Sequence, residues 1–243
     1  MRLTSEQQLY ESLKAGHDRK ARNITETISE HADVNGLYRG RSPLCWARKF
    51  GNKEVEELLL QNGAEEIVDE ELLNSLGEKL IEAARDNRIS LAGDLLEKGA
   101  DIDWQDKDGN TALMCAASCS HASMVRMLLD KDADVTIRNN NGEDALMLEA
   151  ESEMAFNIGK MIRMGADINS RDNDGNTPVI RAARKGSYRG VYSLINLGSD
   201  LTLTNNNGEN ALDVAKDVHS LRFLSDAMNV DNNAPRIDRG VER

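Results

Sequence analysis

Apolar and polar positions alternate along this chain in blocks that recur. Within residues 105–142, the polar stretch 105–110 precedes the largely apolar run 112–117, and a second apolar run covers 124–129 after a short polar turn. Apolar residues three and four positions apart are typical of amphipathic helices. Each block therefore predicts two helices joined by a turn and followed by a polar loop.

The recurrence has one fixed period. Gly109, Gly142, Gly175 and Gly208 lie in successive polar loops, each 33 residues after the last. An Ala-Asp or Ser-Asp pair that closes each block keeps the same interval. A period of this length is typical of a solenoid, in which each repeat buries its apolar face against its neighbours.

Each block also carries local signals for its helices. Thr177 precedes Pro178, which places a capping hydroxyl before a proline that suits the first helical position. Ala182 and Ala183 leave room for a second helix to pack closely. The Asn- and Asp-rich segment 199–208 favours tight turns, and we expect it to form a projecting β-hairpin-like finger.

These blocks resemble the ankyrin repeat. The family signature Thr-Pro-Leu-His-x-Ala is similar to residues 177–182, 111–116 and 42–47, although its His is absent from every block. The resemblance implies an all-α ankyrin-repeat solenoid of about seven helix-turn-helix repeats with projecting β-hairpin-like fingers.

We expect a single domain over residues 1–230 and a disordered, apolar-poor tail over 231–243. The acidic connector 65–77 is the one seam where the array could bend, although continuous stacking is the expectation. The expected units are an irregular N-terminal capping repeat (5–35), repeats at about 38–65, 78–104, 105–137, 138–170 and 171–203, and a C-terminal cap (204–230).

Composition narrows the functional class. Aromatic residues make up 4% of the chain, so the core must be aliphatic, and no apolar run is long enough to span a membrane. A net charge of −12 without a basic stretch argues against nucleic acid and favours a basic protein surface as partner, or serves solubility. The three cysteines, an odd number, predict a reducing compartment, so we expect a cytoplasmic protein, and the acidic, polar surface predicts a monomer.

The sequence gives no support for catalysis or for a cofactor. The Asp-x-Asp-Gly loops lack the outer ligands of a calcium-binding EF-hand, because those positions hold residues such as Trp104 and Arg181. Cys115, Cys119 and His121 lack a fourth zinc ligand, and we expect Cys115 to be a buried core residue. The four histidines fall in four different repeats and cannot converge in a triad. We therefore expect no catalytic, metal-binding or cofactor-binding residues.

The fifth repeat departs from its neighbours. Glu149 replaces the alanines found at positions 116 and 182, Glu153 replaces the turn glycine, and Asn157 occupies an apolar position. A carboxylate at a helix contact is costly unless it is paired. We expect an ion pair with the sixth repeat; the alternative is a charged patch that marks a partner's footprint. The candidate cations are Arg181, Arg184, Lys185 and Arg189.

The resemblance places a partner on the concave surface formed by the fingers and first helices. Trp104 is singled out because aromatic residues contribute strongly to interfaces; the alternative is that it covers the long connector. The candidate partner-binding residues are Trp104, Gln105, Lys107, Asp108, Asn110, Arg138, Asn140, Asn141, Glu151, Arg171, Asn173, Arg184 and Lys185.

The function expected from the resemblance is non-catalytic protein–protein interaction. Two alternatives stay open at this stage. One is a bacterial effector or immunity protein that sequesters a host protein or a toxin, which would place the chain in the host cytosol. The other is a regulatory subunit of an enzyme or a small enzyme, although the motifs count against catalysis. Because one fold serves many functions, the sequence leaves the partner unnamed.

Overall fold

The computed structural model describes residues 33–49 and 53–230. The expected N-terminal capping repeat lies almost wholly outside this part of the chain, and the expected disordered tail lies wholly outside it. The described residues fall into two compact units. The first contains residues up to 79 together with 94–101, and the second contains 80–93 and the residues from 102 onward.

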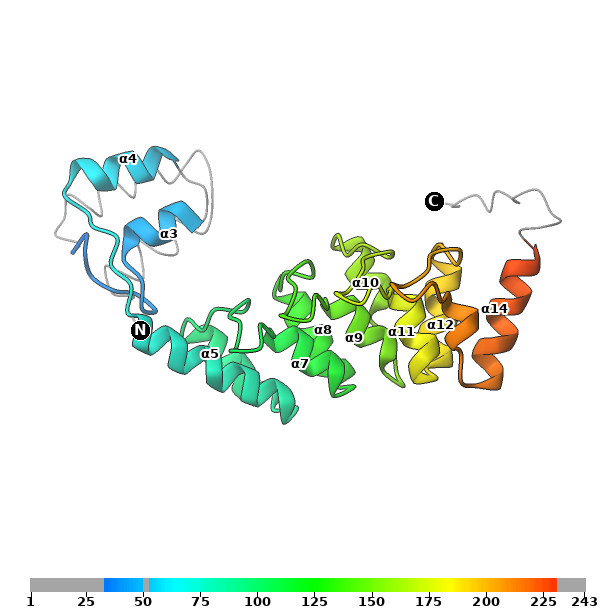
Figure 1. The fold of residues 1–243 in the computed structure, drawn as a ribbon. Coiled ribbons are helices and arrows are strands. Elements are labelled where there is room, and N and C mark those ends of the chain that lie inside the picture. Colours follow the sequence, from blue (N-terminus) through cyan, green and yellow to red (C-terminus); the bar gives the residue numbers. More distant parts are fainter. Residues whose placement is uncertain (1–32, 50–52, 231–243) are drawn as a thin grey trace, which may run out of the picture. The chain divides into compact units, whose positions relative to one another are not determined.

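The first unit holds one helix-turn-helix pair, α3 (Pro43–Lys49) and α4 (Lys53–Gln61) (Figure 1). Leu44 and Trp46 of α3 pack with Val55 and Leu59 of α4 in a common apolar cluster. The buried indole N–H of Trp46 donates a hydrogen bond to the carbonyl of Tyr38 at 3.0 Å, so the polar edge of this aromatic residue is satisfied.

The helices α5 (Glu70–Arg85) and α6 (Ile89–Glu97) follow, and the division between the two units falls within them. α5 begins at Glu70, whereas the sequence led us to expect a repeat starting near residue 78. Leu73 and Leu76 of the connector are buried, and two glutamates in the first turn stabilise the positive end of the helix dipole. Part of the acidic connector is therefore helical.

The second unit is a row of helix pairs. Figure 1 shows α7, α9 and α11 side by side, and α13 extends the same row by packing on α11. The described regular elements are all helices, which confirms the all-α fold. The bounds are α7 Ala112–Ser118, α8 Ala122–Asp130, α9 Ala145–Glu151, α10 Ile158–Arg163, α11 Pro178–Lys185, α12 Tyr188–Asn196, α13 Ala211–Val214 and α14 Val218–Val230.

The first helix of each repeat begins at the same point of the period. Thr111, Asp144, Thr177 and Asn210 are N-caps spaced by 33 residues, and each side chain accepts a hydrogen bond from the backbone N–H three positions on. The cap residue differs from repeat to repeat, but the bond is kept. It satisfies one of the backbone donors that every helix start leaves open.

The loops between repeats are turns, and none of the described residues in them forms a β-strand. The β-hairpin-like fingers that the sequence suggested are therefore not confirmed. Each loop bonds to the next through its backbone: the amides of Asn140, Asn173 and Asn206 donate to carbonyls of the preceding loop at 2.9–3.0 Å. The asparagine side chains reach a second carbonyl there. The loops thus form a hydrogen-bonded ladder along the repeats.

The core between the helix rows is aliphatic, as the scarcity of aromatic residues predicted. Leu113, Met124, Leu128 and Leu146 are almost fully buried. Cys115 is buried as expected, whereas Cys119 directly follows α7 and is exposed. Across the described residues, every helix is too short or too polar to cross a membrane.

Candidate functional site

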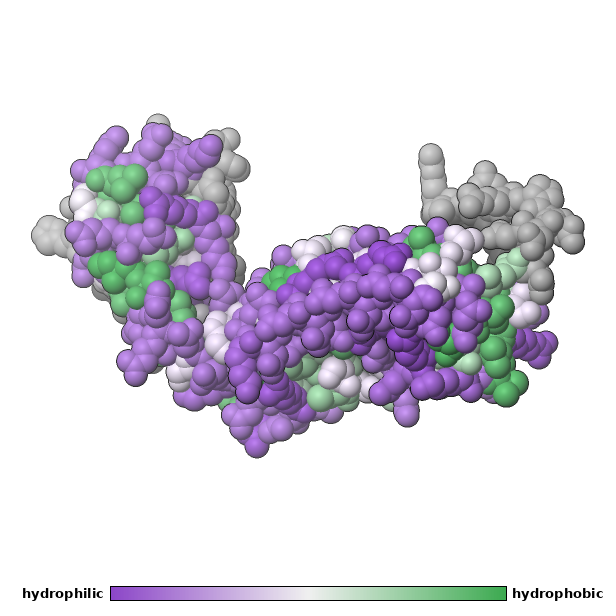
Figure 2. All heavy atoms as spheres, viewed as in Figure 1, coloured by the Kyte–Doolittle hydropathy of each residue, from purple (hydrophilic) through white to green (hydrophobic). Residues whose placement is uncertain are grey.

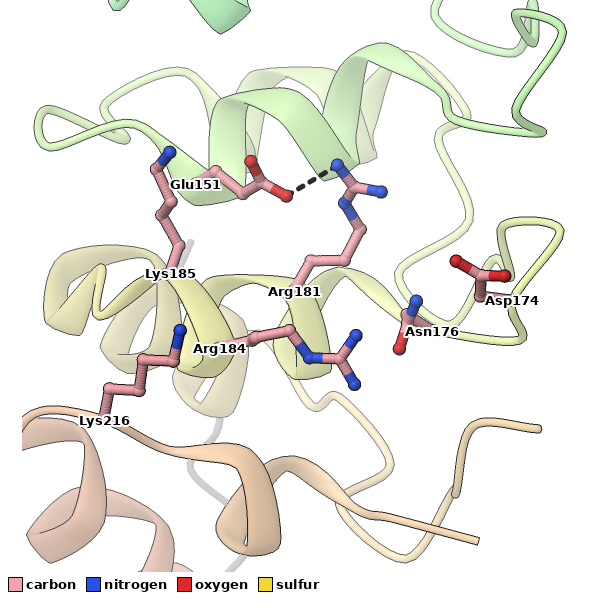
Figure 3. A pocket seen from close by; sticks show the side chains of 7 residues that line it. All are labelled: Glu151, Asp174, Asn176, Arg181, Arg184, Lys185 and Lys216. Carbon is pink, nitrogen blue, oxygen red and sulfur yellow. Dashed lines mark ion pairs between the residues drawn. The ribbon is translucent and has the colours of Figure 1, made fainter. Parts of the chain in front are cut away.

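A polar pocket of about 270 Å³ lies on the first-helix side of the second unit. In Figure 3, α11 lies between α9, which carries Glu151, and the segment after α13, which carries Lys216. We call this pocket the α9–α11 pocket. Its lining residues are Glu151, Asp174, Asn176, Arg181, Arg184, Lys185 and Lys216.

Arg181 of α11 is the structural centre of this pocket. Its guanidinium contacts three carboxylates: Glu143 at 2.7 Å, Glu151 at 2.6 Å and Asp172 at 2.9 Å. Glu143 and Glu151 belong to the fifth repeat, and Asp172 belongs to the loop that precedes α11. These ion pairs are largely shielded from water, because the Arg181 side chain is only 16% exposed. The cation therefore ties two repeats together.

The buried charges shift one another's pKa values. Burial raises the pKa of Glu151, and the nearby Arg181 guanidinium only partly offsets it. Burial also works to raise the pKa of Asp172, but hydrogen bonds from Asn176 and Arg181 outweigh it and lower that pKa. Burial works to lower the pKa of Arg181, and its ion pairs outweigh burial and raise it. In this cluster, the cost of burying the charged groups is opposed by the ion pairs and hydrogen bonds between them.

Three further cations line the pocket with little or no compensation. Arg184 contacts the half-exposed Glu209 at 3.2 Å. Lys185 is exposed, and its electrostatic neighbour is Glu151, which Arg181 already neutralises. Lys216 is exposed, and no carboxylate of the described residues lies within ion-pair distance of it. The pocket can therefore accept an anionic group. Its lining includes no histidine, thiol or hydroxyl that could act in acid–base or nucleophilic chemistry.

The structure corrects the expected partner of Glu149. This carboxylate is 1% exposed, but it does not pair with a cation of the sixth repeat. It accepts hydrogen bonds from the backbone N–H of Asn157 at 3.0 Å and from the Asn157 side chain at 3.1 Å. Burial raises its pKa, and the two bonds from Asn157 oppose that shift. The ion pairs between the repeats go through Arg181 to Glu143 and Glu151 instead.

Most candidate partner-binding residues on the loops take part in the ladder. Gln105 donates to the carbonyl of Arg138, Arg138 donates to that of Arg171, and Arg171 donates to that of Thr204. The carbonyls of Lys107, Asp108 and Asn141 and the Asn110 side chain accept bonds from the next loop, and the Asn140 and Asn173 side chains donate to the previous one. These residues thus hold the loops in register.

The remaining candidates divide by location. Glu151, Arg184 and Lys185 come together in the α9–α11 pocket, whereas Trp104 is half-buried at the base of an earlier loop. Sequence reasoning missed Lys216, because it follows a repeat whose motif is degraded. It also assigned Arg181 no central role, although its charge in an α11 position facing the fifth repeat was a usable signal.

Within the described residues, no group of three His, Cys, Asp or Glu side chains is placed to hold a metal ion.

Comparison with known proteins identifies the repeat type. Residues 80–172 match the family described as ankyrin repeats (3 copies), residues 161–215 match ankyrin repeats (many copies), and residues 39–70 match the single ankyrin repeat. The chain is also similar to the ankyrin repeat domain-containing protein SAT10 of Stachybotrys chartarum, with 34% identity over 112 residues. That stretch is 45% of this chain and 5% of the relative.

Ankyrin repeats generally mediate protein–protein interaction and are typically non-catalytic. The matched segments follow the helix-turn-helix units described above, and they lie in both units of the structure. The chain therefore belongs to the ankyrin-repeat family.

Proposed function

We propose that this protein is a non-catalytic binding module that holds an acidic side chain of a partner protein in the α9–α11 pocket. The observation that carries the proposal is the grouping of Arg184, Lys185 and Lys216 around a hollow whose buried charges are already compensated. An incoming carboxylate would add ion pairs without displacing any that hold the repeats together. Charge-assisted hydrogen bonds of this kind are stronger than neutral ones.

The local charge supports this choice of partner group. The chain as a whole carries −12, yet residues 171–203 hold five cationic and three acidic side chains. A partner whose surface is basic overall, as the total charge favours, would still need an acidic group at this point of contact. Such an arrangement fixes the register of docking, because complementary charge contributes more to specificity than to affinity.

The scaffold is suited to a rigid interaction surface. The ladder fixes the loops before a partner arrives, and the Arg181 cluster fixes α9 against α11. A preformed surface loses little conformational entropy on binding. The other candidate loop residues would then lie at the edge of the same interface.

Affinity capture from lysate of the source cells, followed by mass spectrometry, tests the proposal. Three forms of the full chain are compared: the wild type, the double variant Arg184→Glu/Lys185→Glu, and Lys131→Glu as a control. Lys131 is exposed at the end of α8, outside the pocket. We expect a partner that the wild type and the control retain and the double variant loses. Retention of the same proteins by all three forms would refute the proposal.

A further inference from the structure

A second, chemically different pocket lies on the second-helix side of the same unit. It has a volume of about 320 Å³ and is formed by the loop before α10, by α12 and by α14. We call it the aromatic pocket. The lining residues used below are Met154, Phe156, Tyr188, Arg189, Tyr192 and Phe223.

The exposure of its side chains is unusual for this chain. Phe156 is 65% exposed, Tyr192 52% and Tyr188 42%. Among the described residues, these three are the exposed large hydrophobic residues that are aromatic. All three line this pocket. The chain has nine aromatic residues, and four of them meet here. In Figure 2, apolar atoms of this unit also gather over the end formed by α12 and α14. Grouped exposed aromatic side chains are typical of binding surfaces.

The loop that carries Phe156 is held at both ends. Asn157 anchors its end to the buried carboxylate of Glu149, and the hydroxyl of Ser187 donates to the carbonyl of Ser152 at 2.9 Å. Between these anchors, Ala155 has a φ of +46°, a conformation that residues with a Cβ rarely adopt. The unusual residues of the fifth repeat thus shape the loop that presents Phe156 to solvent.

The opposite wall is equally ordered. Tyr188 and Tyr192 lie one turn apart on α12, and the Tyr192 ring is 5.2 Å from the ring of Phe223 on α14. α12 lies very close to α9, because a Cβ added to Gly190 would be 1.9 Å from the carbonyl oxygen of Ala150. The rings therefore stand on a fixed surface.

Arg189 gives the pocket a charge at its rim. Its Nε donates to the hydroxyl of Tyr188 at 3.0 Å, and its guanidinium lies 5.7 Å from the centre of that ring. No carboxylate of the described residues lies within ion-pair distance of Arg189. An apolar hollow beside a cation without an ion-pair partner is complementary to an apolar group that carries a negative charge next to it.

We propose that the aromatic pocket is a second docking surface, which binds a peptide segment of another protein. In this segment a large aliphatic or aromatic side chain enters the pocket, and an Asp or Glu a few residues away pairs with Arg189. This surface is separate from the α9–α11 pocket, so the proposal does not depend on the function proposed above. The protein would then bind one acidic group in the α9–α11 pocket, on its first-helix side, and another beside the aromatic pocket, on its second-helix side.

Selection from a displayed library of random dodecapeptides tests this inference on the full chain. The expected result is an enriched motif that combines a large apolar residue with Asp or Glu, bound at least about tenfold more weakly by Tyr192→Ser and Phe156→Ser. Leu197→Ala, at an exposed apolar site at the end of α12 outside the pocket, should bind the motif as the wild type does. Arg189→Glu should select Lys or Arg in place of the acidic residue.

Two outcomes would overturn the inference. One is that the selected peptides bind Tyr192→Ser and Phe156→Ser as tightly as the wild type. This outcome includes peptides whose binding depends on Arg184 and Lys185 instead. The other is a wild-type chain that sediments as a dimer and becomes a monomer on Phe156→Ser. That result would assign the pocket to contact between copies of this chain. Far-ultraviolet circular dichroism of each variant ensures that loss of binding is not loss of fold.

Discussion

The buried carboxylate of Glu149 accepts two hydrogen bonds from Asn157, which lies eight residues further along the chain. Both residues break the apolar pattern of the fifth repeat. Asn157 supplies hydrogen-bond donors to the buried carboxylate of Glu149, and Glu149 supplies the acceptor for them. Glu149 stands where neighbouring repeats have alanine, and Asn157 is the N-cap of α10. Together they close the loop that carries Met154 and Phe156, so two departures from the repeat pattern form one structural feature.

Removing the amide should leave the carboxylate buried without its side-chain donor. We predict that Asn157→Ala lowers the free energy of unfolding by about 1–3 kcal/mol, because the buried carboxylate loses one of its two hydrogen bonds and keeps only the one from the backbone N–H. Urea denaturation measures the change. Asn196→Ala, at an exposed position at the end of α12, serves as the control and should change stability by less than about 0.5 kcal/mol. Equal effects of the two substitutions would contradict the assignment.

The pH dependence of stability should report the raised pKa of Glu149. Burial places that pKa above its ordinary value of 4.5, so the folded state takes up a proton at higher pH than the unfolded state. The cost of burying the charge is present at neutral pH and is relieved as pH falls toward 4.5. The wild type should therefore gain stability relative to Glu149→Gln as pH falls from neutral toward 4.5. Parallel urea midpoints for the two proteins over this range would show that Glu149 does not titrate as described.

Arg181 should be the most sensitive charged position of the second unit. Its removal leaves Glu143, Glu151 and Asp172 together without their shared cation. We predict that Arg181→Ala lowers the free energy of unfolding by about 3 kcal/mol, as loss of one partner of a shielded ion pair does. Arg184→Ala provides the comparison, because its single ion pair with Glu209 is half-exposed and is expected to contribute less than about 1 kcal/mol. Similar losses measured by urea denaturation would rule out the central role of Arg181.

Substitution of two glycines in the ladder distinguishes the cost of an unfavourable backbone conformation from the cost of a steric clash with the neighbouring loop. Gly142 and Gly208 occupy equivalent loop positions and have φ values of +74° and +80°. A Cβ on Gly142 would lie 2.9 Å from the backbone nitrogen of Asn173, whereas nothing lies within 4 Å of a Cβ on Gly208. We predict a cost of about 1–2 kcal/mol for Gly208→Ala from conformation alone.

Gly142→Ala should cost about 1–3 kcal/mol more than Gly208→Ala, because it also crowds the neighbouring loop. The difference between the two thermal or urea unfolding curves isolates the contact between loops. If the two substitutions have equal effects, the loops of the ladder do not pack against one another this closely.

The repeating parts of this structure were predictable because they depend on local patterns. The spacing of Gly109, Gly142 and Gly175 predicted the loops, and Thr177 with Pro178 predicted a helix start that the structure confirms. The Asn- and Asp-rich segment 199–208 suggested a β-hairpin-like finger, which is not confirmed, because its described residues form turns. Their carbonyls and amides bond to the neighbouring loop, and one repeat in isolation gives no sign of such bonds.

The errors at the candidate site have a different origin. Charge alone suggested that Glu149 pairs with a cation of the next repeat, but Arg181 bonds to the carboxylates of Glu143 and Glu151 instead. Which carboxylate an arginine reaches depends on helix orientation within a few ångströms, and sequence spacing does not give that orientation. The aromatic pocket was missed because Phe156, Tyr192 and Phe223 come from three separate repeats. The four-residue spacing of Tyr188 and Tyr192 was its one local sign.

The dissociation constant of the captured partner is the most direct measure of the proposed function. It is determined by titration calorimetry for the wild type, Arg184→Glu/Lys185→Glu and Lys131→Glu in the same buffer. We expect binding at least about tenfold weaker for the double variant, with the control unchanged, because reversal of two adjacent charges places like charges against the acidic group. A dissociation constant for the double variant equal to that of the wild type would contradict it.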